Sequence, residues 1–315
     1  MAVTRRLVQF FAHAAVVGFA AVMSLAHAQP YGYSVRSEID DRLYRINLAT
    51  GVAEQLGVTG FGKIEGLALN AAGELFGVNL IPQAPAQTVK CSTTSGVCTS
   101  VGSTTQTSGG SAGLAFSPTG QLYLAMNSAL FSVNPQTGAA TALSASSGPT
   151  ISGLASGAIT AQCGTGIYAL AGNSDAGKLY CVNTTTGALT LLGSLPGLTT
   201  TTAIDAGLDG DRTTGVLWGI TNPSDSNAPA QIFSVAPETL AISALTPVTL
   251  SGAPIGGFES LAVEPSSAVS GPTQIPTVST VGLLAVGLGL CGFAFAALRR
   301  REAELRAIRA RVVRR

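Results

Sequence analysis

Three acidic residues are the first candidates for chemistry in this sequence. Glu65, Asp205 and Glu259 each stand just before a short apolar segment, and Ala112 and Ser152 occupy the matching place before two similar segments. Carboxylates brought together from separate segments can bind Ca²⁺ through oxygen ligands, or act as acid and base on a glycosidic bond. They can also be solvated turn residues or hydrogen-bond to neighbouring backbone. The choice depends on where the fold places these segments.

A second acidic group lies in the stretch IDAGLDGDRTTG, which contains Asp205, Asp209 and Asp211. Its composition resembles an acidic Ca²⁺-binding loop. The spacing D-x-x-x-D-x-D has no later Glu of the kind that completes an EF-hand loop. A solvated hairpin is therefore the alternative interpretation of this stretch.

The elements that must position these acids are short strands. The segment 113–143 holds four runs of apolar or β-prone residues, each ending in Gly, Pro, Asn or Ser. The runs lie at 113–116, 122–126, 130–133 and 139–143. Such runs, separated by turn residues, predict antiparallel strands joined by hairpins.

The same four-strand unit recurs along the chain. Its aromatic second strand recurs at 75–78, 122–125, 167–170 and 217–220, and its third strand at 43–46, 130–133, 179–182 and 232–235. The turn glycines Gly51, Gly96, Gly138 and Gly187 are spaced 45, 42 and 49 residues apart. Repeats of this length are typical of propellers. We therefore expect an all-β propeller with five blades of four antiparallel strands; six blades and an open stack of sheets are the alternatives.

The two ends of the repeat region favour a closed ring. The last repeat stops after its first strand at 259–263, while the expected mature N-terminus begins with a second-strand motif at 31–35. The N-terminal residues can therefore complete the last blade and remove the open sheet edges that a row of blades would leave. First strands line the centre of a propeller, so the three acids would meet at the mouth of its channel. The aromatic rings of the repeats would form core between blades.

The N-terminus has the pattern of an export signal. A basic start and a mostly apolar stretch at 7–25 precede Ala26-His27-Ala28, a small-x-small cleavage site that ends before Gln29. This pattern predicts a signal peptide over residues 1–28, with Sec-type export machinery and signal peptidase as partners. An uncleaved membrane anchor is the alternative.

Histidine is confined to that segment. The chain has two histidines, His13 and His27, so the mature protein would contain none. A Ser-His-Asp or Cys-His arrangement needs an imidazole base, and histidine-ligated metal sites need the same side chain. No phosphate-binding or dinucleotide glycine motif is present either. The sequence therefore predicts a protein that is not an enzyme and has no cofactor, with calcium as the one exception.

The C-terminus carries a different signal. Residues 281–298 form an apolar segment just long enough to span a bilayer, and Arg299, Arg300 and Arg301 follow at once and favour a cytoplasmic end. The preceding stretch and this helix resemble the IPTL-CTERM sorting signal of Gram-negative bacteria, Ile-Pro-Thr-Leu-x-x-Trp-Gly followed by an apolar helix and an Arg cluster. The matching residues are Ile275, Pro276, Thr277 and Gly282, while Val278 and Val281 replace the Leu and the Trp.

The resemblance implies that an exosortase-type membrane enzyme recognises and removes the tail. The body would then be released or transferred to a surface acceptor, as with other signals whose hydrophobic tail is lost. A plain single-pass anchor is the alternative. In either case the body lies in the cell envelope, on the surface or outside the cell, anchored to the inner membrane at least transiently. The expected parts are a signal peptide (1–28), a propeller (29–266), a linker with the sorting motif (267–280), a transmembrane helix (281–298) and a basic tail (299–315).

Charge and cysteine content agree with an exported body. Residues 29–274 hold seven Lys or Arg and fourteen Asp or Glu, a net charge of about −7. A surface of that sign does not attract nucleic acid, whose binding depends on neutralising phosphates. Two disulfides are expected, because exported proteins keep them. Cys91 and Cys98 flank a predicted hairpin turn, and Cys163 and Cys181 lie in predicted neighbouring strands of one blade.

These observations favour a binding or structural module of the cell envelope or surface. A carbohydrate-active hydrolase that uses Glu65, Asp205 and Glu259 is one alternative. An adhesion or matrix protein without a small ligand, which makes contact through its Thr- and Ser-rich loops, is the other.

Overall fold

The structure is a computed structural model that describes residues 29–37, 39–143, 148–203, 205–223 and 228–266. The predicted signal peptide, sorting motif and transmembrane helix lie outside these residues. Contacts divide the chain into two compact units, Met1–Ser267 and Ala268–Arg315. In the described ranges, no helix has the length and apolar character needed to cross a membrane.

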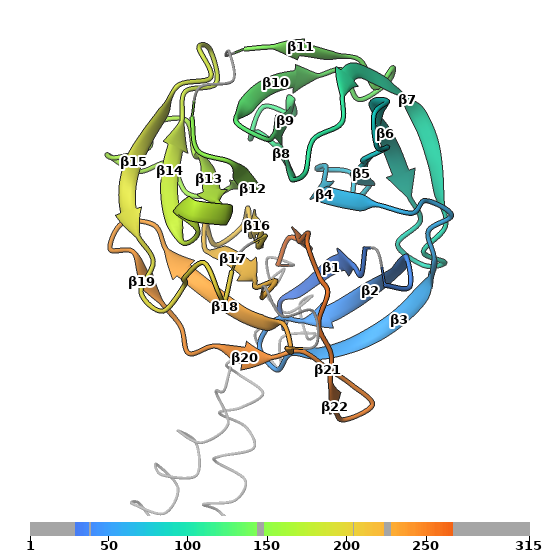
Figure 1. Cartoon of the computed structure of the whole chain (residues 1–315). Coiled ribbons are helices and arrows are strands. Elements are labelled where there is room, and N and C mark those ends of the chain that lie inside the picture. The colour runs from blue at the N-terminus through green and yellow to red at the C-terminus, as the bar shows by residue number, and fades with distance from the viewer. Residues whose placement is uncertain (1–28, 38, 144–147, 204, 224–227, 267–315) are drawn as a thin grey trace, which may run out of the picture. The chain divides into compact units, whose positions relative to one another are not determined.

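The described part of the first unit is built from strands arranged as five sheets around one axis (Figure 1). The first sheet contains β4 (Ile64–Leu69), β5 (Leu75–Asn79), β6 (Pro85–Cys91) and β7 (Cys98–Thr107). The second contains β8 (Ala112–Phe116), β9 (Leu122–Met126), β10 (Ala129–Val133) and β11 (Ala140–Ala142), and the third β12 (Ile151–Ser156), β13 (Ile167–Ala171), β14 (Lys178–Val182) and β15 (Leu189–Ser194). A 3₁₀ turn, η1 (Asn173–Asp175), follows β13.

The remaining two sheets are larger. The fourth contains β16 (Gly207–Gly210), β17 (Leu217–Ile220) and β18 (Gln231–Ala236), with β19 (Ala241–Ile242) and β20 (Thr246–Pro247) both pairing with β18. The fifth runs in the order β22 (Ala253–Pro254), β21 (Thr249–Leu250), β3 (Val52–Val58), β2 (Arg42–Asn47), β1 (Tyr31–Val35) and β23 (Ala262–Val263). Five sheets confirm the predicted five-bladed propeller.

The ring closes where the two ends of this unit meet, as predicted. Strand β1 pairs antiparallel with β23, with Tyr33 opposite Ala262. Next to this pairing, Arg45 Nε and Nη2 donate to the two carboxylate oxygens of Glu264 at 2.7 and 2.9 Å. The Arg45 guanidinium also lies 3.8 Å from the centre of the Tyr31 ring. The sequence did not predict β21, which extends the closing sheet by pairing parallel with β3.

Glycines at the centre let the inner strands approach closely. A Cβ at Gly66 would lie 2.9 Å from the backbone nitrogen of Leu114, and one at Gly113 would lie 2.6 Å from that of Leu154. The same contact recurs between Gly153 and Leu208 at 2.7 Å. Any side chain here would overlap the backbone of the next blade, so the Gly-Leu pattern of the first strands is a packing requirement.

The hydrophobic core lies between neighbouring blades. Phe76 of β5 meets Phe116 of β8 edge to face, with ring centres 5.3 Å apart. Tyr44 of β2 meets Phe258 in the same way at 5.4 Å. Most of the repeated aromatic residues are buried, as expected, and they include Tyr44, Phe76, Phe131, Tyr168 and Phe233.

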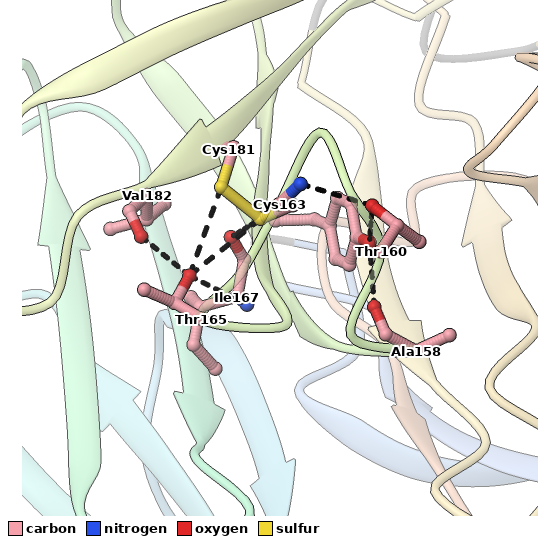
Figure 2. The surroundings of a disulfide bond; sticks show 8 residues. Ala158, Thr160, Cys163, Thr165, Ile167, Cys181 and Val182 are labelled. Atoms are coloured by element: carbon pink, nitrogen blue, oxygen red, sulfur yellow. Dashed lines mark hydrogen bonds between the residues drawn. A yellow bond between two sulfur atoms is a disulfide. The ribbon is translucent and has the colours of Figure 1, made fainter.

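Both predicted disulfides are present. Cys91 and Cys98 are directly opposite each other on β6 and β7. Cys163 bonds to Cys181 of β14. The sequence pattern predicted a strand at Cys163, whereas the structure places it in the loop before β13. Figure 2 shows how that loop is held: the Thr165 hydroxyl donates to the Val182 carbonyl at 2.7 Å, and Thr160 Oγ1 accepts from the Cys163 backbone N–H at 3.0 Å.

Substituting Gly113 by Ala should destabilise the propeller by about 1–3 kcal/mol, the usual cost of overpacking a close contact. The added methyl group would meet the Leu154 backbone, which cannot rotate away. Gly164→Ala is the matched control, because an added Cβ there meets no atom within 4 Å. Urea unfolding would measure both, and equal losses would contradict the packing requirement.

Replacing Cys163 and Cys181 by Ser should lower the free energy of unfolding by about 3 kcal/mol, and replacing Cys91 and Cys98 by about 2 kcal/mol. The order follows from the sequence separations of 18 and 7 residues, because the longer loop loses more chain entropy when it is closed. Urea unfolding of the two double variants, each compared with the oxidised wild type, measures the difference. A larger loss from the shorter loop would contradict the expected order.

Candidate functional site

The three acids singled out in the sequence come together at the starts of the inner strands. Glu65 is the second residue of β4, Asp205 comes just before β16, and Glu259 comes just before β23. One carboxylate oxygen from each lies within 4.8 Å of the others. We call Glu65, Asp205 and Glu259 the acid cluster. Three separate blades supply its members, so the cluster exists only in the closed ring.

The predicted repeat pattern aligned Asp205 with Glu65 and Glu259, but Asp205 stands one position earlier in the repeat than they do. Glu65 and Glu259 stand immediately before Gly66 and Ser260 of the inner-strand pattern, whereas Ala206 stands before Gly207 and Asp205 precedes it. The position that matches Asp205 in the second blade is that of Ser111. The shorter Asp side chain nonetheless reaches the cluster from this earlier position.

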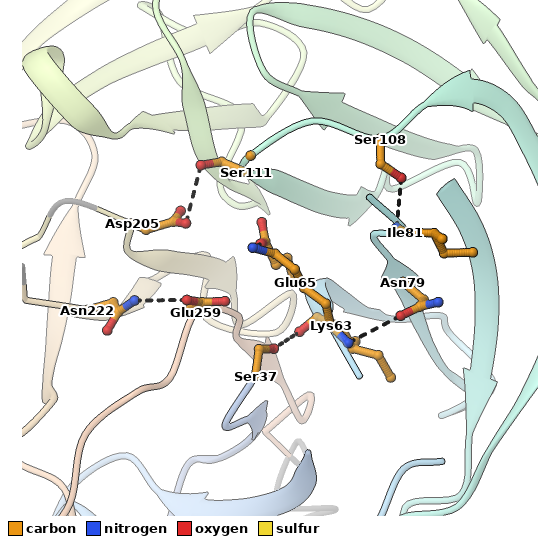
Figure 3. A network of polar contacts seen from close by, with 12 residues as sticks. Ser37, Lys63, Glu65, Asn79, Ile81, Ser108, Ser111, Asp205, Asn222 and Glu259 are labelled. Carbon is orange, nitrogen blue, oxygen red and sulfur yellow. Dashed lines mark hydrogen bonds and ion pairs between the residues drawn. The ribbon is translucent and has the colours of Figure 1, made fainter. Parts of the chain in front are cut away.

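Side chains from other blades hold two of the acids (Figure 3). The Ser111 hydroxyl donates to Asp205 Oδ2 at 3.2 Å, and Asn222 Nδ2 donates to Glu259 Oε1 at 3.3 Å. Asp205 and Glu259 are half-buried, and a protein donor orients one carboxylate oxygen of each.

Glu65 is in a different environment, with only 1% of the residue exposed. Its Oε2 has no hydrogen-bond partner among the residues that the structure describes. Burial raises the pKa of Glu65 to about 9, and the charges of Asp205 and Glu259 add to this effect. Lys63 opposes it, with its ammonium nitrogen 3.0 Å from Glu65 Oε1. The site thus contains three carboxyl groups and one ammonium group to balance their charge.

Sequence reasoning missed the residues around the acids. Lys63 contacts Glu65, its backbone N–H donates to Asn79 Oδ1 at 3.3 Å, and Asn222 contacts Glu259. A signal for part of this shell was present, because an Asn ends or closely follows the second strand in four repeats. These are Asn79, Asn127, Asn173 and Asn222.

Asp209 and Asp211 do not join Asp205 in a calcium loop. The Val263 backbone N–H donates to Asp209 Oδ2 at 2.8 Å, so this buried acid ties β16 to the closing strand β23. Asp211 accepts from the Thr213 backbone at 2.9 Å and from the Thr214 hydroxyl at 2.8 Å. The three acids of this stretch therefore do not gather into one loop site, because Asp209 and Asp211 each have protein donors of their own.

The spacing of the acid cluster decides between two kinds of chemistry. Glycosidase carboxyl groups are about 5–5.5 Å apart in retaining enzymes and about 6.5–9.5 Å apart in inverting ones, to leave room for the sugar and for water. The cluster atoms lie within 4.8 Å, and one of the three acids is almost fully buried. This arrangement is closer to a set of oxygen ligands for one small ion than to an acid and base pair.

Comparison with known proteins does not identify a family for this chain. No family model matches the sequence, and no curated protein matches it. Among solved structures, a chain of a nidogen/laminin complex is similar, with 14% identity and a TM-score of 0.45 over 76% of this chain and 86% of that one. A protein of unknown function from Bacteroides caccae has 10% identity and a TM-score of 0.45 over 75% and 98%. Likenesses this distant say nothing about function.

The buried acid predicts a pH dependence of stability that Glu65→Gln should remove. Folded Glu65 keeps its proton up to about pH 9, whereas an unfolded chain releases it near the model-compound value of 4.5. The folded state therefore binds more protons between these values, and the free energy of unfolding of the wild type falls as pH rises through that window. The groups that face Glu65 are Lys63, Asp205 and Glu259.

Urea unfolding at pH 5, 7 and 9 with a chelator present would measure this dependence. The Gln variant should lose less stability than the wild type, and its advantage should grow with pH. Glu74→Gln is the control, because Glu74 is an exposed acid paired with Lys90. Parallel pH profiles for wild type and Glu65→Gln would show that Glu65 is not held protonated by its surroundings.

Proposed function

We propose that this protein is an exported β-propeller that works as a binding or structural module in the cell envelope or outside the cell. The observation that carries the proposal is the pair of disulfides, Cys91–Cys98 and Cys163–Cys181, in the body of the ring. Such bonds persist in oxidising compartments and are rare in the cytosol. They support the export that the N-terminal pattern predicts.

The geometry supports binding better than catalysis. The acid cluster, with its oxygens within 4.8 Å and one member almost fully buried, suits ion binding better than an acid and base pair around a glycosidic bond, and residues 29–315 contain no histidine that could serve as base. Aromatic rings, on which sugars commonly stack, are mostly committed to packing between blades, as at Phe76 and Phe116. A rigid closed ring with polar loops is suited to holding a ligand or a partner at a fixed surface.

The C-terminal part of the proposal concerns where this module is delivered. The match at Ile275, Pro276, Thr277 and Gly282, followed by an apolar segment and an Arg cluster, supports recognition by an exosortase-type enzyme. In this proposal the tail is removed after export. The propeller is then released or attached to a surface acceptor.

The intact mass of the native protein, purified from its own cells, tests both signals. The expected mass corresponds to a chain that starts at Gln29 and ends between Ile275 and Thr280, plus any acceptor. A mass that still includes Arg315 would contradict processing and leave a plain membrane anchor. A mass that includes Met1 would contradict the export signal.

A pair of variants makes the processing test specific. Replacing Pro276 and Thr277 together by Ala should leave the tail attached, because the residues shared with the sorting signal are lost. Pro272→Ala, just upstream of that motif, should be processed like the wild type. Equal processing of both variants would show that the motif is not what the cell recognises.

A further inference from the structure

The acid cluster has the geometry of an ion site. One oxygen from each of Glu65, Asp205 and Glu259 lies within 4.8 Å of the other two. Oxygen ligands around Ca²⁺ stand about 2.3–2.6 Å from the ion, so two ligands on opposite sides are about 5 Å apart. A single ion placed among the three oxygens can therefore contact all three carboxylates.

The buried member of the cluster provides an independent reason to expect a cation. Glu65 is 1% exposed, and its Oε2 has no hydrogen-bond partner within the described ranges. Buried carboxylates are normally hydrogen-bonded, paired or bound to a metal, because desolvating them is costly. Lys63 contacts Oε1, and one carboxylate oxygen of Glu65 lies within 4.8 Å of an oxygen of Asp205 and of Glu259 (Figure 3).

The surroundings of the other two acids resemble the support around known metal ligands. Ser111 and Asn222 donate to Asp205 and Glu259, and outer donors of this kind fix the orientation of ligating carboxylates. Water molecules would complete the coordination shell of an ion held by these three side chains.

We infer that Glu65, Asp205 and Glu259 together bind one divalent cation, and that this cation is Ca²⁺. Carboxylate oxygens suit hard ions such as Ca²⁺, Mg²⁺ and Mn²⁺. Mg²⁺ demands near-ideal octahedral geometry at about 2.0–2.1 Å, whereas Ca²⁺ accepts irregular shells of six to eight oxygens. Ligands that three separate blades hold at a fixed spacing fit the more tolerant ion.

The role of the ion in this inference is to hold three blades together. Glu65 belongs to the first sheet, Asp205 precedes the fourth, and Glu259 precedes the closing strand of the fifth. Binding to the folded ring alone stabilises it by mass action. The inference goes beyond the proposed function and does not depend on the tail being processed.

Calorimetric titration of CaCl₂ into the chelator-treated full-length protein tests the site. The expected result is saturable binding of about one ion per chain, accompanied by a rise in melting temperature that MgCl₂ does not match. Glu259→Gln and Asp205→Asn should each weaken binding about tenfold or more, since affinity follows the charge of the ligand set. Glu74→Gln removes the same charge from an exposed ion pair and should leave binding unchanged.

Lys63→Gln separates this inference from a purely structural role of the cluster. If a cation binds, removing the competing ammonium beside Glu65 should strengthen Ca²⁺ binding several-fold, because a like charge is lost. If Lys63 is the only counter-ion the acids require, the variant should melt lower and gain no calcium affinity.

Two results would overturn the inference outright. One is the absence of saturable binding to the wild type up to about 10 mM CaCl₂, beyond the range of weak extracellular calcium sites. The other is an equal loss of affinity in Glu74→Gln and Glu259→Gln. Melting curves in chelator establish that each variant is folded, and the wild-type titration decides the first question without any variant.

Discussion

The inner strands of this ring approach one another so closely that backbone packs against backbone. Gly66, Gly113, Gly153 and Gly207 each leave less than 3.0 Å between an imagined Cβ and the next inner strand. Five blades can surround one axis at this distance only if those positions lack side chains. The large residues are placed instead between blades, where Phe76 and Phe116 form part of the core. The tight centre therefore requires glycine on the inner strands and leaves the hydrophobic core to lie between the blades.

The same close approach explains the electrostatics of the site. Inner strands that nearly touch bring the residues at their starts together, so Glu65, Asp205 and Glu259 share one small volume although they are far apart in sequence. Burial, together with the charges of Asp205 and Glu259, disfavours the charged form of Glu65 and so raises its pKa. The packing of the ring and the pairing of β1 with β23 sustain this arrangement. Lys63 supplies one positive charge, and a bound cation would supply more.

Much of the fold was predictable because its signals are local and repeated. Strand patterns, turn glycines and the missing second strand of the last repeat were enough to predict five blades and closure by residues 31–35. The meeting of the acids followed from their places at the starts of the inner strands, although Asp205 stands one position earlier than the other two. Contacts across blades, such as Ser111 with Asp205 and Asn222 with Glu259, depend on how the sheets are placed around the axis. Sequence patterns do not give this arrangement. Cys163 was placed wrongly because its loop has no counterpart in the other repeats.

A crystal structure of the protein grown with CaCl₂, with anomalous scattering recorded to identify the ion, tests the account most directly. The account predicts five blades, β1 paired with β23, and one calcium ion about 2.3–2.6 Å from an oxygen of each acid of the cluster. Inner strands too far apart to require glycine, or acids of the cluster pointing away from one another with no ion between them, would contradict it.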